Sequence, residues 1–95
     1  MTNMQLPKII GRFMFDSITT SFSYKGNKMF SAVYRNPKNG IKMTIFTFFD
    51  EQLDKQTFGI KVKGSTIRGV QSFDRVIEVA NTIVEENDSF LADDE

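Results

Sequence analysis

The sequence predicts an α+β domain in which an antiparallel sheet of five or six strands is packed on one face by a single C-terminal helix. Three observations support this fold class. Before residue 70, apolar and polar residues alternate in short runs, as they do in half-buried strands. Turn-forming Gly, Asn and Pro residues separate several of these runs. After residue 72, apolar residues recur at steps of three and four, which is the period of a helix.

The helix is predicted over Ser72–Glu86. Ser72 is a suitable N-cap because its hydroxyl can accept a hydrogen bond from a free amide of the first turn. Asp74 follows where the helix dipole favours negative charge. One stripe of the helix is apolar and needs a sheet to pack against; it comprises Phe73, Val76, Ile77, Ala80, Ile83 and Val84.

The first half of the chain predicts one strand and then a hairpin. A strand is expected over Ile9–Phe15, ended by Asp16 and Ser17. Two further strands flank Lys25-Gly26-Asn27, a three-residue turn signal, and the expected register places Phe22 opposite Phe30. This register gathers the aromatic residues on one face, which comprises Thr20, Phe22, Tyr24, Phe30, Ala32 and Tyr34.

The second half predicts a strand with two partly apolar faces. Asn36–Gly40 is a dense turn signal, and the strand Ile41–Phe49 follows it. Phe46 and Phe48 share a face with Lys42, whereas the other face carries Ile41, Met43, Ile45 and Phe49. Such a strand is central in its sheet, or its second face is covered by something outside this chain. A polar connection over 50–55, an alternating strand over 58–63 and a short strand over 66–69 complete the sheet.

The domain is predicted to span residues 1–86, with a flexible acidic tail over 87–95. The formal net charge of zero hides an asymmetry. Residues 1–49 hold seven basic residues against one acid, whereas the last eleven residues hold six acids and no base. Uneven surface charge and a functional basic surface are both consistent with this pattern.

Composition excludes most catalytic chemistry. The chain has no cysteine and no histidine, so the most ready nucleophile and the commonest general base are both missing. Asp50, Glu51 and Asp54 lack the spacing of a calcium loop, and no phosphate-binding glycine motif is present. We therefore expect no enzyme activity, no metal and no cofactor. The first residues resemble no signal peptide and no long apolar run exists, which predicts a cytoplasmic protein without a membrane partner.

The candidate site combines basic and aromatic residues. Bases stack on exposed aromatic rings while phosphates pair with neighbouring cations, and sheet-surface proteins hold single strands in this way. Packing in the core is the alternative for every Phe. The predicted nucleic-acid-binding residues are Lys28, Arg35, Lys38, Lys42, Phe46 and Phe48.

The segment 30–72 resembles one repeat of the TATA-binding-protein family. The likeness lies in FSAVYRNP at 30–37, in Ile45-Phe46, and in Gly69-Val70-Gln71-Ser72 before the helix. That family places a curved antiparallel sheet beneath a C-terminal helix, so the resemblance implies the same arrangement and favours nucleic acid as the partner. The chain departs from the family by extra residues between Phe46 and Gly69 and by holding a single repeat.

The predicted function is that of a small non-enzymatic nucleic-acid-binding protein that prefers single strands. The alternative is a protein-binding module or inhibitor, of the kind that phages and other mobile elements encode, which turns the same sheet face to a protein partner. The sequence leaves open whether the chain forms a homodimer, and whether the acidic tail competes with phosphate for the basic residues.

Overall fold

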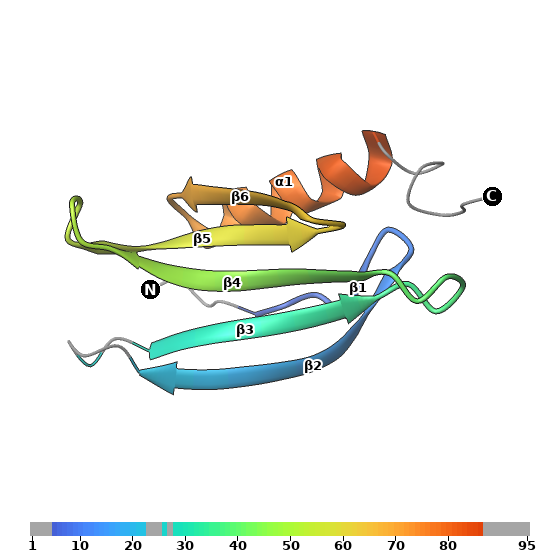
Figure 1. The fold of residues 1–95 in the computed structure, drawn as a ribbon, viewed down its shortest axis with the longest axis horizontal. Coiled ribbons are helices and arrows are strands. Elements are labelled where there is room, and N and C mark those ends of the chain that lie inside the picture. The colour runs from blue at the N-terminus through green and yellow to red at the C-terminus, as the bar shows by residue number, and fades with distance from the viewer. Residues whose placement is uncertain (1–4, 23–25, 27, 87–95) are drawn as a thin grey trace.

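The computed structural model describes residues 5–22, 26 and 28–86. These residues form a six-stranded antiparallel sheet and a helix. The elements in chain order are β1 (Ile9–Ile10), β2 (Phe13–Phe22), β3 (Lys28–Arg35), β4 (Lys42–Asp50), β5 (Lys55–Val62), β6 (Ser65–Val70) and α1 (Phe73–Glu86). The strands lie in the sheet in the same order, so each one pairs with its neighbours in the chain (Figure 1). The predicted fold class is confirmed.

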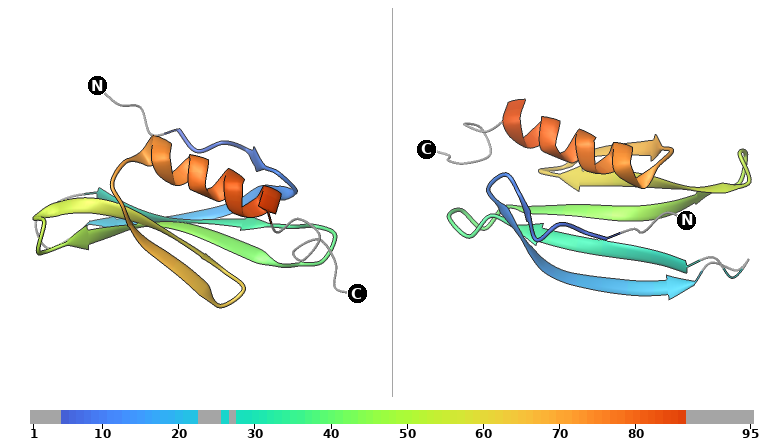
Figure 2. Two further views of the ribbon diagram at one scale, coloured as in Figure 1. Left: turned by 90° about the horizontal axis from the view of Figure 1, so that it is seen from above. Right: turned by 180° about the vertical axis from the view of Figure 1, so that it is seen from behind.

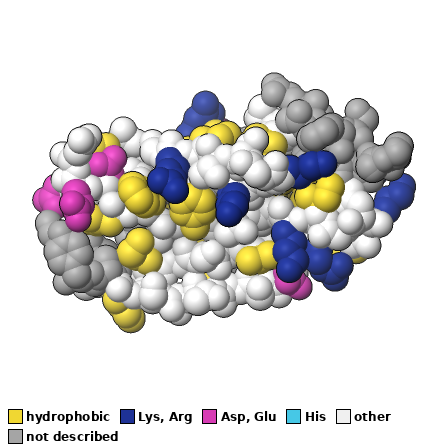
Figure 3. Space-filling view, in the orientation of Figure 1, with side chains coloured by type: hydrophobic (Ala, Val, Ile, Leu, Met, Phe, Trp, Pro, Cys, Tyr) yellow, Lys and Arg dark blue, Asp and Glu magenta, His cyan; other side chains and the backbone are white. Residues whose placement is uncertain are grey.

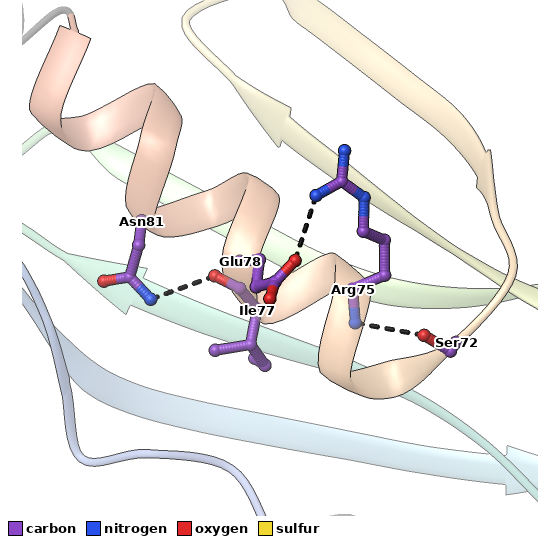
Figure 4. Close-up of polar contacts among 5 residues, drawn as sticks. All are labelled: Ser72, Arg75, Ile77, Glu78 and Asn81. Carbon is purple, nitrogen blue, oxygen red and sulfur yellow. Dashed lines mark hydrogen bonds and ion pairs between the residues drawn. The ribbon is translucent and has the colours of Figure 1, made fainter.

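Helix α1 begins as the sequence predicts. The Ser72 hydroxyl accepts a hydrogen bond of 3.1 Å from the Arg75 amide, as an N-cap does (Figure 4). On the exposed side Arg75 forms an ion pair of 2.9 Å with Glu78, one turn away. On the other side Val76 and Ala80 are completely buried. The apolar stripe therefore packs against the sheet, where α1 contacts β5, β6 and β1.

The N-terminal segment forms a second cover that the sequence did not predict. Residues 5–10 run beside α1 over the same face of the sheet (Figure 2). The Tyr34 hydroxyl donates a hydrogen bond of 2.6 Å to the Pro7 carbonyl, and the Phe15 amide donates one of 2.9 Å to the Lys8 carbonyl. Leu6 packs against the core. The helix and this segment thus cover the face together.

A turn at Gly11 divides the predicted strand Ile9–Phe15, and that prediction is wrong. Gly11 has a φ of +59°, which a side chain disfavours, and with Arg12 it forms a two-residue loop between β1 and β2. A Cβ at Gly11 would also collide with the Val84 side chain of α1. Glycine at this position therefore permits both the reversal of the chain and the close approach of the helix.

Strand β2 continues through Asp16 and Ser17, where the sequence predicted a break. The register of β2 against β3 shifts between Phe15 and Ser17, so Asp16 occupies a bulge inside a continuous strand. Further along, Phe22 lies opposite Lys28 rather than opposite Phe30. The observed register thus differs from the predicted one by two residues, and an even difference keeps the described residues of both strands on their predicted faces.

The core lies between the sheet and its two covers. Its centre is β4, where Met43 and Ile45 are completely buried, which confirms the expectation that this strand is central. The backbone pairing between β3 and β4 ends at Ser31. Next to it, the Thr47 hydroxyl of β4 accepts a hydrogen bond of 2.9 Å from the Phe30 amide and donates one of 3.3 Å to the Phe30 carbonyl. The far end of the β2–β3 hairpin therefore separates from β4.

A candidate nucleic-acid interface

The face of the sheet opposite α1 carries the candidate site, and we call it the open face. Figure 1 looks directly at this face, with α1 and the N-terminal segment behind the sheet. The space-filling view shows Lys and Arg side chains spread around hydrophobic side chains on it (Figure 3). By strand alternation and register, its central residues are Ser31, Val33, Arg35, Lys42, Thr44, Phe46, Phe48, Gly59, Lys61, Thr66 and Arg68.

Two cations face each other at one end of the open face. Arg35 on β3 lies directly opposite Lys42 on β4, and both side chains are exposed. Like charges in this arrangement repel, so the pair costs stability in the free protein. Within the described part of the chain, neither cation has an acidic partner at ion-pair distance. An anion bound between them would relieve the repulsion.

Lys61 extends the basic surface onto β5. It lies between Thr44 on β4 and Thr66 on β6, so a hydroxyl-bearing residue is its partner on each neighbouring strand. The acids of the described strands are Asp16, at the bulge of β2, and Asp50, at the end of β4. The centre of the open face is therefore positively charged, and a phosphate could accept hydrogen bonds from both the lysine and the threonines.

The ring of Phe46 lies over the neighbouring strand, β5. Gly59 is opposite it on β5, and a Cβ added there would meet the Phe46 ring, with Cε1 at 2.7 Å. The same Cβ would lie 2.8 Å from the backbone carbonyl oxygen of Ile67 on β6. The absence of a side chain at Gly59 thus lets the ring lean over β5, where it stays partly exposed.

Phe48 is the more exposed ring, with 37% of its surface accessible. The Arg68 guanidinium of β6 lies over this ring, with its carbon 5.4 Å from the ring centroid. Opposite Phe48, the Thr57 hydroxyl donates a hydrogen bond of 3.1 Å to the Phe48 carbonyl, which ties β5 to β4 beneath the ring. Arg68 therefore places a positive charge against an aromatic ring at the other end of the open face from Arg35 and Lys42.

The structure brings four of the six predicted residues together. Arg35, Lys42, Phe46 and Phe48 share the open face. Lys28 lies on the opposite face by strand alternation, because it precedes Phe30 by two residues.

Lys38 lies in the β3–β4 loop, where its amide donates to Asn36 Oδ1 at 2.9 Å. Two cations of the open face were missed: Lys61 and Arg68 lie outside the basic N-terminal half. The alternation of Gly59, Lys61 and Lys63 with apolar residues was the available signal for Lys61.

The acidic residues that the sequence singles out lie near the β4–β5 turn and in the C-terminal tail. Asp50 Oδ1 accepts hydrogen bonds from the Gln52 amide at 2.9 Å and the Leu53 amide at 3.2 Å, so it shapes the β4–β5 turn. In residues 5–22, 26 and 28–86, no group of three or more acidic side chains is placed to hold a metal ion. The predicted acidic tail, residues 87–95, lies outside the described residues.

Comparison of the chain with models of known families, with curated proteins and with solved structures finds no match. These comparisons give no support to the resemblance of segment 30–72 to a TATA-binding-protein repeat. None of the described segments forms a helix that is both long enough and apolar enough to span a bilayer.

Proposed function

We propose that this chain is a non-enzymatic cytoplasmic protein that binds single-stranded nucleic acid on the open face of its sheet. One observation carries the proposal: four cations from four different strands, Arg35, Lys42, Lys61 and Arg68, share a solvent-exposed face with the rings of Phe46 and Phe48. Phosphate contacts supply affinity and stacking supplies sequence-tolerant attachment of bases.

The shape of the open face favours a single strand over a duplex. Phe46 and Phe48 are two residues apart on one strand, which spaces their side chains by about 7 Å along it. Unstacked bases can reach such rings, whereas the bases of a duplex are stacked on one another. On the described residues α1 lies behind the sheet, so it is not placed to enter a groove from this face.

Fluorescence anisotropy with a labelled single-stranded oligonucleotide, titrated at several salt concentrations, tests the proposal. The double variant Lys42→Gln with Lys61→Gln should weaken binding and reduce the slope of log K against log salt by roughly 1–2 units. Lys28→Gln is the matched control, because it removes the same charge from the opposite face and should change the slope less. Phe48→Ala should reduce affinity by about 1–3 kcal/mol without changing the slope.

Two results would contradict this function. The first is no binding to single- or double-stranded DNA or RNA at low salt, since clustered accessible cations give at least weak non-specific affinity. The second is an equal effect of Lys28→Gln and Lys42→Gln on the slope, which would place the bound phosphates elsewhere.

The second candidate is a protein-binding module or inhibitor of the phage type. Met29, Val33 and Phe46 are partly exposed on the open face and Phe48 is more so, which gives this face an apolar component suited to a protein interface. Binding to a protein through these side chains would depend little on ionic strength, so the salt titration separates the two functions. Capture from a host lysate with and without nuclease tests the same distinction.

A further inference from the structure

The outer edge of β2 is open over most of its length. Strand β1 pairs only with Phe13 and Met14 of β2, whereas β3 pairs with β2 as far as Phe22. Among the described residues, no strand lies beside Ser17–Phe22 on the outer side. A regular edge of this kind presents unpaired backbone amides and carbonyls, which form a template for another strand.

The open edge also carries exposed apolar side chains. Ile18 is 45% exposed and Phe22 is 71% exposed, on the face that α1 covers elsewhere. Residues 17–22 contain no charge and no proline, the residues that discourage pairing at an edge. The opposite edge of the sheet differs, because β6 carries Arg68 and a register irregularity near Gly69, whose φ is +81°. Of the two edges, β2 is the one suited to pairing.

The sequence of this edge is nearly the same in both directions. Residues 17–23 read SITTSFS, so apolar residues stand two positions on either side of Thr20 and hydroxyl-bearing residues stand at one and three positions. Ser23 lies outside the described residues, and the other six belong to β2. A symmetric interface between two identical strands requires such a pattern, because residue i must fit residue j while j fits i.

We propose that two copies of this chain pair through β2 in antiparallel orientation, about a two-fold axis that passes beside Thr20 perpendicular to the sheet. Ile18 then faces Phe22 of the second copy, and the two Thr20 residues face each other. The axis keeps both helix-covered faces on one side. The product is a continuous sheet, and its symmetry closes the assembly at a dimer.

The backbone of β2 is oriented for this pairing. Side-chain face and backbone direction alternate together along a strand, and the Phe15 amide points outward to the Lys8 carbonyl. Ile18, Thr20 and Phe22 share the face of Phe15, so their amides and carbonyls also point outward. Pairing about Thr20 then forms about six intermolecular backbone hydrogen bonds. A single short strand pair makes a small interface, so we expect reversible dimerisation at micromolar concentration.

Dimerisation is independent of the proposed function but would extend it. Because the axis is perpendicular to the sheet, the open faces of both copies lie on the same side of the joined sheet. One nucleic-acid strand could then bind the open faces of both copies at once. This would raise its overall affinity although its contacts with each copy stay the same.

Sedimentation velocity of the full-length chain at roughly 1–300 μM tests the pairing directly, since this range covers the dissociation constants of weak interfaces. We expect a monomer–dimer equilibrium without larger species. Thr20→Pro removes one outward-pointing amide at the centre of the interface and leaves the β2–β3 ladder intact, so it should give a monomer with an unchanged circular dichroism spectrum. Thr20→Ala keeps that amide and should still dimerise.

A charge exchange tests the register. Ile18→Lys with Phe22→Lys places like charges across the axis, whereas Ile18→Lys with Phe22→Glu places opposite charges there. Both double variants lose the same two apolar side chains, yet the second should dimerise about tenfold more tightly. A wild-type chain that stays monomeric throughout the concentration range overturns the proposal. So does equal dimerisation of the two charge variants, or a native-like Thr20→Pro variant that still dimerises.

Discussion

The facing cations Arg35 and Lys42 give a prediction in which stability and binding change in opposite directions. Lys42→Gln removes the repulsion across β3 and β4 while keeping a side chain of similar length. Relief of a like-charge pair on an exposed sheet face should raise the free energy of unfolding by about 0.2–0.5 kcal/mol at low salt. For a domain of this size, the melting temperature should rise by about 1–4 °C.

Lys61→Gln is the matched control for this prediction. The charge that it removes lies on the same face, but Thr44 and Thr66 lie opposite it in place of a second cation. Its melting temperature should therefore stay near that of the wild type. In 1 M NaCl the gain of Lys42→Gln should shrink, because the screening length falls to about 3 Å.

The assay combines thermal melts with the binding titration described above. Lys42→Gln should melt higher and bind a single-stranded oligonucleotide more weakly, whereas Lys61→Gln should only bind more weakly. These opposite effects are expected of a cation that contributes to binding but lowers the stability of the free protein. If the two variants melted at the same temperature at low salt, repulsion between Arg35 and Lys42 would not lower the stability of the free protein, and an anion bound between them would have no repulsion to relieve.

Two further predictions concern contacts that position the sheet. Tyr34→Phe removes the 2.6 Å hydrogen bond to the Pro7 carbonyl and should lower the free energy of unfolding by about 1–2 kcal/mol in urea titrations. Burial raises the pKa of Tyr34 from 10.0 to about 12, so its contribution to stability is complete below pH 10 and is lost as pH rises towards 12. The Tyr34→Phe variant should not lose this part of its free energy of unfolding at alkaline pH. If its stability fell with pH just as that of the wild type does, Tyr34 would not be the group that titrates. Gly59→Ala should cost about 1–3 kcal/mol, since the new Cβ meets the Phe46 ring and lies 2.8 Å from the Ile67 carbonyl oxygen. Adding Phe46→Ala should recover part of that loss in a double-mutant cycle, and strict additivity would show that the ring is not the obstacle.

Local periodicity was sufficient for much of the fold. The step of three and four after Ser72 predicted α1, and the hydroxyl of Ser72 predicted its start. Alternation along 41–49 placed Phe46 and Phe48 on the face of Lys42, where the structure has them. These predictions succeed because a side chain's face depends only on its position in its own helix or strand.

Neighbour relations between strands lay beyond the sequence pattern. The charge count assigned the basic surface to residues 1–49, yet strand pairing adds Lys61 and Arg68 to it. The face of Lys28 was different, because alternation within β3 alone already separates Lys28 from Arg35. The turn at Gly11 also escaped prediction, because the apolar run around it continues on both sides.

By itself, the sequence determined which residues share a face within β3, β4 and β5 and where the helix begins. The tertiary structure alone decided that residues 5–10 fold back beside α1, through the Tyr34 hydroxyl and the close approach of Gly11 to Val84. It also decided that cations from four strands meet on one surface. The physical reason is range: periodicity is a property of a few consecutive residues, whereas strand register and chain reversal depend on contacts between residues far apart in the chain.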